Sequence, residues 1–309
     1  ARLKTCSLNV NGLQDETKRR NIFNFLRNQD CDIFLLQEVH AANLQECAKW
    51  TSEWEGQAFW SCGTSRARGV AILFKKNFNF NILYKNNDLE GRILSLCINI
   101  ESTSIQLVNV YAPNIPTERK NFFNNIFNYA KLGFPTIVGG DFNCIEDVNI
   151  DKWGGSPLYG EAGKIELINF LNNFNVTDIY RHVKPQGREI TWRDKNGTVG
   201  CRLDRFYLPV NFLTGFTSCE ILPCGFTDHY LVKTHCEIPD SLPRGKGVWK
   251  FNVSLLQDEC FCSEVKSFWA AWGTQENKKD FPDCRIWWDL GKFKIKKLAI
   301  KHSIRRSRG

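Results

Sequence analysis

The feature that most constrains the fold of this chain is a repeated change of hydrophobic period along its first three quarters. Up to about residue 238, short β-rich runs bounded by Gly, Asn, Asp or Pro alternate with longer segments whose apolar residues recur every three or four positions. The first pattern is typical of strands and the second of amphipathic helices. Because each helix must bury its apolar face against a sheet, this alternation predicts a layered α/β domain.

The elements that these patterns predict are short and evenly spread. The predicted strands are Lys4–Val10, Ile33–Glu38, Val70–Phe74, Arg92–Ile100, Ile105–Val110, Thr136–Gly139, Leu203–Leu208 and Leu231–Cys236. The predicted helices are Thr17–Asn28, Thr117–Leu132 and Lys164–Phe174. A protruding hairpin is predicted at residues 193–200, because Asn196 and Gly197 form a strong tight-turn signal between two strand-like runs.

A Pro- and Gly-rich stretch at residues 238–247 interrupts the alternation. Trp-rich helical segments follow it, at about Val253–Trp272 and Cys284–Ser303. We therefore expect one domain at 1–238 and a helical extension at 239–309. No apolar run approaches the roughly 20 residues of a membrane helix, so no membrane partner is expected. The chain contains no methionine, which indicates a fragment of a longer protein.

The distribution of charge indicates a binding partner, and the cysteines indicate the redox compartment of the protein. Residues 1–239 carry 26 Lys and Arg against 25 Asp and Glu, whereas residues 240–309 carry 15 against 8. This basic C-terminal stretch favours a polyanion such as nucleic acid, although a solvated helical face would have the same composition.

The 13 cysteines form no CxxC pair. They indicate buried small side chains in a reducing, intracellular compartment rather than a disulfide scaffold or a zinc site.

Five polar clusters each lie at the end of a predicted strand, where α/β folds collect their catalytic groups. They are Asn9 with Asn11, Glu38, Asp141 with Asn143, Asp204, and Asp228 with His229. Spacing of two residues points Asn9 and Asn11 to the same side, and likewise Asp141 and Asn143. Each cluster alone is explained equally well by a helix cap, a turn or a structural histidine. Five together favour a site, because a core gains nothing from unpaired carboxylates.

The residue types suggest a reaction. Carboxylates and amides without paired Cys or His ligands suit a hard cation such as Mg²⁺. A histidine beside them can donate to a phosphate oxygen, and a carboxylate can fix its tautomer. A further Asp, held by an Asn, can orient and deprotonate water. The set predicts metal-assisted phosphodiester hydrolysis.

Eight short motifs occur in a fixed order. They are SerLeuAsnValAsnGlyLeu, GlnGluValHis, ArgGlyValAlaIleLeuPhe, ValAsnValTyrAlaProAsn, GlyGlyAspPheAsn, AspIleTyrArg, ArgLeuAspArgPheTyr and ThrAspHis. The series resembles that of the exonuclease III and AP-endonuclease-like nucleases. It is most similar to the endonuclease domain of LINE (non-LTR) retrotransposons, from residue 1 to about 238. The resemblance implies an α/β, deoxyribonuclease-I-like fold: a four-layer sandwich of two mixed β-sheets flanked by helices, here with a helical C-terminal extension.

The resemblance also implies roles for individual residues. Glu38 would be the principal ligand of Mg²⁺, with Mn²⁺ as a substitute, and Asn11 and Asp228 would lie on the metal side. The catalytic assignments are Asp141 for activating water, Asn143 and Asn9 for orienting it, His229 and Tyr111 for contacting the phosphate, and Asp204 for orienting His229.

Four further residues are expected to bind DNA: Thr191, Arg193, Lys195 and Arg205. The first three lie at or in the 193–200 hairpin, which would enter a groove and bias target choice. Arg205 stands where some relatives carry His, and arginine suits phosphate binding. Asn11 stands where the repair enzymes carry Asp, a change shared with the retrotransposon branch. It argues against repair of abasic sites.

The implied function is a Mg²⁺-dependent endonuclease that nicks one strand of double-stranded target DNA. The nick would leave a 3′-hydroxyl that primes target-primed reverse transcription. The C-terminal segment resembles the linker toward a covalently continuous reverse transcriptase, and its basic tail is a candidate contact for the element's RNA. Its tryptophans, Trp249, Trp269, Trp272, Trp287 and Trp288, indicate helix packing more than base stacking. The protein would be made in the cytoplasm and act in the nucleus.

Two alternatives remain open. One is a phosphoesterase of the same fold that acts on abasic-site DNA, RNA or a lipid, because a fold does not determine its substrate. The other is a nucleic-acid-binding module whose catalytic site has decayed, although a decayed copy should have lost at least one of the five clusters.

Overall fold

A computed structural model describes residues 2–155, 162–239, 251–274 and 284–306. The chain folds into two compact units, Ala1–Gly245 and Lys246–Gly309, which are described separately. Most of the predicted junction at 238–247, and Trp249 with it, lies outside the described residues.

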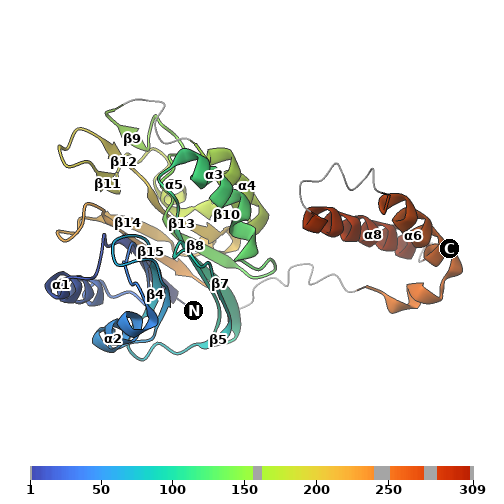
Figure 1. Cartoon of the computed structure of the whole chain (residues 1–309), viewed down its shortest axis with the longest axis horizontal. Helices are drawn as coiled ribbons and strands as arrows, with labels where there is room; N and C mark the ends of the chain where they lie inside the picture. The colour runs from blue at the N-terminus through green and yellow to red at the C-terminus, as the bar shows by residue number, and fades with distance from the viewer. Residues whose placement is uncertain (1, 156–161, 240–250, 275–283, 307–309) are drawn as a thin grey trace. The chain divides into compact units, whose positions relative to one another are not determined.

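Two six-stranded sheets form the centre of the first unit (Figure 1). The order in the first sheet is β14 (Ser218–Leu222), β15 (Leu231–Glu237), β1 (Arg2–Asn9), β2 (Ile33–Gln37), β4 (Val70–Phe74) and β3 (Ala58–Ser61). The order in the second is β10 (Val176–Asp178), β13 (Asp204–Pro209), β8 (Thr136–Asp141), β7 (Thr103–Tyr111), β6 (Ile93–Ile100) and β5 (Asn81–Asn87). Both sheets are mixed, because β1 pairs with β2 and β7 pairs with β8 in parallel whereas the other neighbours are antiparallel.

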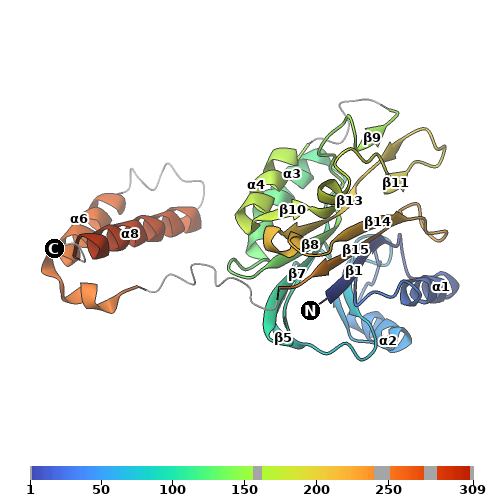
Figure 2. The same ribbon diagram turned by 180° about the vertical axis from the view of Figure 1, so that it is seen from behind.

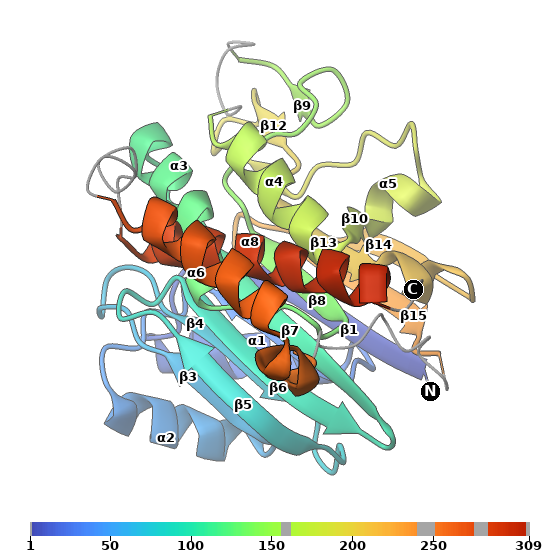
Figure 3. The ribbon, with the colours of Figure 1, turned by 90° about the vertical axis from the view of Figure 1, so that its right-hand side faces the viewer.

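Helices cover the outer faces of both sheets. On one side lie α1 (Glu16–Arg27) and α2 (Leu44–Trp54), and on the other lie α3 (Pro116–Asn125) and α4 (Lys164–Phe174) (Figures 2 and 3). Three apolar clusters separate these layers, one between the sheets and one beneath each helical layer. Burial of this apolar surface drives the layers together. The predicted four-layer sandwich is confirmed.

The predicted helix Thr117–Leu132 is too long. α3 ends at Asn125, and a short 3₁₀ helix, Ile126–Asn128, continues it. The apolar spacing of this segment is helical, but four asparagines interrupt it, and asparagine is a weak helix former that competes for backbone hydrogen bonds. The other two predicted helices agree with the structure to within one residue at each end.

The predicted hairpin at 193–200 is present. Its strands β11 (Trp192–Arg193) and β12 (Gly200–Cys201) pair antiparallel, and β9 (Lys152–Trp153) joins them in a small third sheet. Gly197 adopts a φ of 67°, a conformation that L side chains rarely take. A short helix, α5 (Ile179–Val183), follows β10.

A pair of buried amides links the two sheets across the central core. The Gln37 Nε2 atom on β2 donates to the Asn109 Oδ1 atom on β7 at 2.8 Å. In turn Asn109 Nδ2 donates to the backbone oxygens of Leu36 and Ala71, at 2.9 and 2.8 Å. Both side chains are fully buried, so every one of these bonds satisfies a group that water cannot reach.

The second unit is helical, as predicted. It contains a 3₁₀ helix (Val253–Gln257), α6 (Glu259–Trp272) and α8 (Cys284–Arg306), which pack around Leu255, Phe261 and Ala299. Indole rings pack against one another between α6 and α8, including Trp269 on Trp287 at 5.7 Å between ring centroids. In the part of the chain that the structure describes, no helix has the length and apolar character needed to cross a bilayer.

We predict that Asn109→Ala lowers the free energy of unfolding of the protein by about 2 to 4 kcal/mol. The substitution removes the donor that binds two buried backbone oxygens and one of the three acceptors of the Gln37 amide, which keeps its bonds to Ser7 and Leu35. Urea denaturation followed by circular dichroism measures the change. Asn81→Ala, on the exposed edge strand β5, is the matched control and should stay within about 0.5 kcal/mol. Equal stability of the two variants would contradict the prediction.

Candidate active site

Strand topology brings the predicted polar clusters to one edge of the sandwich. The parallel pairs place the carboxyl ends of β1, β2, β7 and β8 at this edge, and the antiparallel neighbours β13 and β15 begin there. In the strand registers, Tyr111 lies opposite Asp141, and Asp141 lies opposite Asp204. The edge therefore assembles side chains that are up to about two hundred residues apart in sequence.

A histidine lies between two buried carboxylates. The His229 Nδ1 atom is 2.9 Å from Asp204 Oδ2, and its Nε2 atom is 4.0 Å from Asp141 Oδ2. All three residues are at most 7% exposed. With Nδ1 on Asp204, the ring turns Nε2 toward Asp141, so the histidine can present a proton on that side.

Asn9 joins the other half of the site. Its Nδ2 atom donates both to Glu38 Oε1 at 2.9 Å and to Asp141 Oδ2 at 3.1 Å, and its Oδ1 atom accepts from the Asn11 backbone. Since Asn9 is fully buried at the end of β1, this amide fixes the spacing of the two carboxylates.

Glu38 is held in an unusual backbone conformation, with a φ of 52°. Non-glycine residues in this region are strained, and such strain is concentrated at functional sites. Burial raises the pKa of Glu38, but interactions with His40, Asn9 and Tyr111 and the charge of His229 outweigh it and lower the pKa to about 2. Glu38 therefore stays ionised at every physiological pH.

The charges within the buried group perturb one another. Burial and the negative charge of Asp204 raise the pKa of Asp141 to about 7. Burial lowers the pKa of His229, but the charges of Asp204, Asp141 and Asp228 prevail and raise it to about 10. The histidine is therefore a proton donor near neutral pH, and Asp141 can take up a proton there.

Asn143 and Tyr111 line the same edge. The Asn143 backbone N–H donates to Asp141 Oδ1 at 2.9 Å, and its side chain donates to the backbone oxygen of Ala112 at 2.8 Å. Burial and the charges of Glu38 and Asp141 raise the pKa of Tyr111 far above its ordinary value. Its hydroxyl keeps its proton and can act only as a neutral donor or acceptor.

Asp228 is held from both sides at the mouth of the site. Asn11 Nδ2 lies 3.3 Å from its Oδ1 atom, and Trp192 Nε1 lies 3.1 Å from its Oδ2 atom. The preceding residue, Thr227, donates its hydroxyl to the Asn9 backbone oxygen at 2.9 Å. The loop that carries Asp228 and His229 is thus attached to the end of β1.

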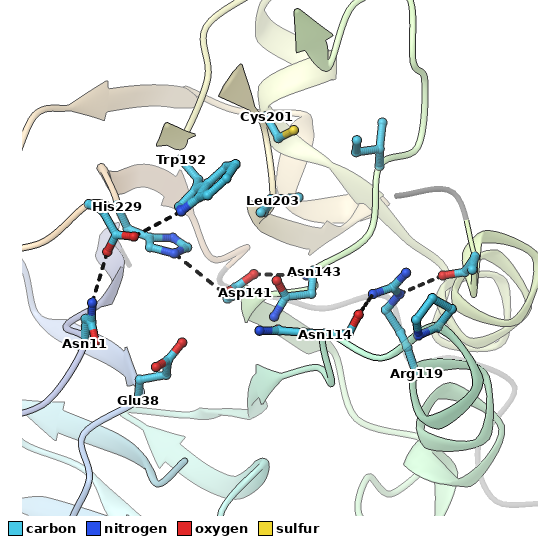
Figure 4. Close-up of a pocket in the computed structure, with 14 residues that line it drawn as sticks. Asn11, Glu38, Asn114, Arg119, Asp141, Asn143, Trp192, Cys201, Leu203 and His229 are labelled. Carbon is cyan, nitrogen blue, oxygen red and sulfur yellow. Dashed lines mark hydrogen bonds and ion pairs between the residues drawn. The ribbon is translucent and has the colours of Figure 1, made fainter. Parts of the chain in front are cut away.

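These groups face a cavity of about 280 Å³. Figure 4 shows Asn11, Glu38, Asp141 and His229 around it, with Trp192 on one wall. The other walls combine less polar side chains with polar ones; the former are Pro116, Ile145, Ala162, Cys201 and Leu203, and the latter are Asn114, Asn143 and Arg119. A cavity lined by both apolar and polar groups is common in sites that bind small molecules or small groups of a substrate.

The chemistry of the donors fits a hard divalent cation. Glu38, Asn11 and Asp228 offer only oxygen ligands, which is the ligand type that Mg²⁺ prefers. A second group of three possible ligands, Asp141, Asp204 and His229, has atoms within 4.8 Å of one another. In that group the His229 Nδ1 atom already bonds to Asp204, which leaves the oxygen-rich side as the better match for Mg²⁺.

The contact of Thr191 with DNA stays a prediction, and in the structure its side chain is fully buried. Its Oγ1 atom accepts from the backbone N–H groups of Leu203 and Asp204, each at 2.9 Å. Its backbone oxygen accepts from Tyr230 N at 2.7 Å. Thr191 therefore braces the start of β13 and the loop that carries His229.

The assignment of Arg205 to DNA binding likewise stays a prediction, and the structure places this residue in the interior. Its guanidinium is fully buried, donates to the backbone oxygen of Arg202 at 2.8 Å and lies 4.0 Å from Asp151. Asp151 also accepts from Arg202 Nε at 2.6 Å and from Arg181. The arginine belongs to an internal charge network, because the alternation of β13 turns it away from the edge that Asp204 faces. In contrast, Arg193 and Lys195 are exposed on the hairpin.

Several residues of this region are not among the site residues predicted from the sequence, and they include His40, Trp192, Asn114 and Arg119. His40 lies 3.5 Å from Glu38 Oε2, and Trp192 and Asn114 line the cavity. His40 and Asn114 belong to the quoted motifs GlnGluValHis and ValAsnValTyrAlaProAsn, so position within a motif was the available signal. Trp192 lies in none of the quoted motifs, and its position directly before the predicted hairpin is a weaker signal.

Comparison with known proteins identifies a protein family that matches most of this chain. A model described as "Endonuclease/Exonuclease/phosphatase family" matches residues 6–229. The Transposon TX1 uncharacterized 149 kDa protein of Xenopus laevis is 30% identical over 306 residues, which is 97% of this chain and 23% of that protein. The chain thus spans about a quarter of that relative. An exodeoxyribonuclease of Bacillus subtilis (strain 168) is 24% identical over 229 residues, covering 66% of this chain and 87% of its own.

Solved structures show the same fold. An AP endonuclease from Leishmania major aligns with a TM-score of 0.62 at 18% identity, over 77% of this chain and 88% of its own. Together with the family model, this similarity confirms the expected resemblance to exonuclease and AP-endonuclease-like proteins.

We predict that the metal-free protein keeps His229 as an imidazolium through pH 8. Its pKa in the folded state, about 10, lies above the ordinary value of 6.5. The stabilisation from this charge is therefore complete below about pH 6.5 and is lost as the pH rises toward 10. Nitrogen-15 NMR of the ring measures the charge state, with His229→Gln to assign the signal. Asp204→Asn should lower the pKa, and a neutral ring at pH 7 in the wild type would contradict the prediction.

Proposed function

The chain belongs to the endonuclease/exonuclease/phosphatase family, and on that basis we propose that it is a divalent-metal-dependent endonuclease that nicks one strand of DNA. The observation that supports this most is the Asn9 amide between Glu38 and Asp141, with the Asp204–His229 pair on the far side of Asp141. A carboxylate for a cation, an acceptor for a water proton and an imidazolium for a phosphate thus meet in one cavity.

In this proposal Glu38, with Asn11 and Asp228 beside it, would hold Mg²⁺. The bound cation, for which Mn²⁺ can substitute, would neutralise charge that develops on the phosphate oxygens. The chain's own groups supply the proton transfers and the orientation. Asp141 would accept a proton from the attacking water, and its acceptor oxygens are kept in place by Asn9 and the Asn143 backbone.

On the phosphate side, His229 would donate from Nε2 to the phosphate, with Asp204 keeping the ring oriented. Tyr111 would donate its hydroxyl to the same group, which its retained proton allows. Beyond the cavity, the exposed side chains of Arg193 and Lys195 on the hairpin would contact the DNA.

We further propose that the chain is the nuclease part of a LINE-type retrotransposon polyprotein. The nick would expose a 3′-hydroxyl that primes reverse transcription in the nucleus, by a reverse transcriptase domain on the same polypeptide. Support comes from the similarity to a transposon protein more than four times as long as the matched segment. In the proposed division, residues 1–238 form the nuclease domain and residues 239–309 the linker toward the reverse transcriptase.

The linker would also attract nucleic acid. Residues 240–309 hold nearly all of the excess positive charge of the chain, and Lys294, Lys297 and Lys301 are exposed on α8. Positive side chains on one helix attract phosphates without reading sequence, and the element's RNA is a candidate ligand as well as DNA.

We predict that His229→Ala and Asp141→Asn each lower the rate of plasmid nicking by about a thousandfold, because general acid and base groups contribute on this scale. Relaxation of supercoiled plasmid in Mg²⁺ measures the rate, and chelation by EDTA should abolish it. His182→Ala, on the exposed surface of α5, is the matched control and should retain activity. Activity confined to sphingomyelin, inositol phosphates or poly(A) in parallel assays would overturn the proposal.

We predict that replacing Lys294, Lys297 and Lys301 together by Gln reduces the salt dependence of DNA binding. Each phosphate contact contributes about 0.9 to the slope of log K against log salt concentration. Loss of three such contacts should lower the slope by about 2 to 3 while the rate of nicking at saturating DNA stays the same. Fluorescence anisotropy between 50 and 200 mM salt tests this, and an unchanged slope would assign the linker to spacing alone.

A further inference from the structure

Trp192 occupies a position in the site that the proposed chemistry does not explain. Its indole forms part of the wall of the cavity (Figure 4), which Asp228 also lines. The Nε1–H group donates to Asp228 Oδ2 at 3.1 Å, while the Asn11 amide lies 3.3 Å from the other oxygen. Each oxygen of an exposed carboxylate is thus held by a neutral donor from a different part of the chain.

The backbone of Trp192 is also joined to the loop that carries Asp228 and His229, which we call the catalytic loop. Trp192 forms an isolated antiparallel bridge with His229, and the Tyr230 N–H donates to the Thr191 oxygen at 2.7 Å. On its other side, Thr191 binds the backbone N–H of Asp204. Hence the base of the hairpin is hydrogen-bonded to Asp204 and to Tyr230, the residue that follows His229.

These contacts restrict Asp228 in a specific way. An exposed aspartate has two soft torsions and would otherwise sample several orientations in water. A donor on each oxygen selects one orientation, in which the carboxylate faces the cavity beside Asn11. Outer groups that orient a metal-binding carboxylate in this manner commonly change metal affinity by an order of magnitude or more.

We propose that Trp192 is a positioning residue, whose indole N–H fixes Asp228 for cation binding and thereby couples the hairpin to the catalytic loop. This inference rests on the proposed function, because it assigns Asp228 to the metal side. The hydrogen bond, and not the aromatic surface, carries the effect. A ring that only contacted the substrate would show no dependence on Asp228.

The experiment separates the N–H group from the ring. Trp192→Phe keeps most of the aromatic surface and removes the donor. Measured on the full chain without DNA, by calorimetry or by electron paramagnetic resonance, its affinity for Mn²⁺ should be about tenfold lower than that of the wild type. Trp153→Phe, on the adjacent strand β9, is the matched control and should bind Mn²⁺ as the wild type does.

A double-mutant cycle with Asp228→Ala gives the second readout. In that background, Trp192→Phe should cause no further loss of Mn²⁺ affinity or of nicking rate. An equal loss in both backgrounds would show that Trp192 acts independently of Asp228 and would overturn the inference. Wild-type Mn²⁺ affinity in Trp192→Phe would overturn it as well.

The two proposals fail separately. If the wild-type protein neither binds Mn²⁺ nor nicks DNA, the proposed function fails and the inference fails with it. If the wild type does both and Trp192→Phe matches it in each assay, only the role of Trp192 is removed.

Discussion

The hydrogen bond between Gln37 and Asn109 joins the two sheets, and the geometry of the site depends on it. Gln37 is followed at once by Glu38, and Asn109 lies two residues before Tyr111 at the end of β7. Apolar contacts between sheets are nondirectional and allow sliding, whereas a buried amide pair permits one arrangement. Because Asn109 also binds backbone oxygens of β2 and β4, a shift of either sheet would break several bonds at once. The carboxylates from the two sheets therefore meet at a fixed separation.

The site gathers more negative charge than a buried region ordinarily tolerates. Asp141 and Asp204 lie opposite each other on neighbouring strands, and one histidine offsets them from one side only. The structure reduces the cost with hydrogen bonds, chiefly from Asn9 and from the Asn143 backbone, and leaves the pKa of Asp141 raised. Such an arrangement costs stability in isolation and becomes favourable when a cation or a proton is present. The charge pattern is what a site for charged substrates requires and what a purely structural core would avoid.

The sequence predicted well which polar residues gather at one edge of the sandwich, because the signal is local: a β-rich run followed by a polar residue marks a strand end. It carried little information where the direction of a side chain decides its surroundings. Arg205 follows Asp204 directly, yet alternation along β13 places it in an internal network, and only the pairing of β13 with β8 reveals this. The small polar side chain of Thr191 can either face solvent or bind backbone N–H groups, and the sequence does not distinguish the two. The edge strand β5 was not predicted, because tertiary pairing forms it. Helix α2 was not predicted either, although its buried residues Cys47, Trp50 and Trp54 recur every three or four positions.

The base and the tip of the 193–200 hairpin differ in what they are hydrogen-bonded to. The base, Thr191 and Trp192, forms hydrogen bonds with four residues outside the hairpin: Leu203, Asp204, Asp228 and Tyr230. The tip around Gly197 is closed by hydrogen bonds within the hairpin, between Asp194 and Gly197 and between Asp194 and Val199. Residues at the tip can therefore differ in length and charge between related chains without disturbing the hydrogen bonds at the base. In the proposed nuclease, preference for one DNA sequence over another would then reside in the tip, apart from the groups that perform the reaction.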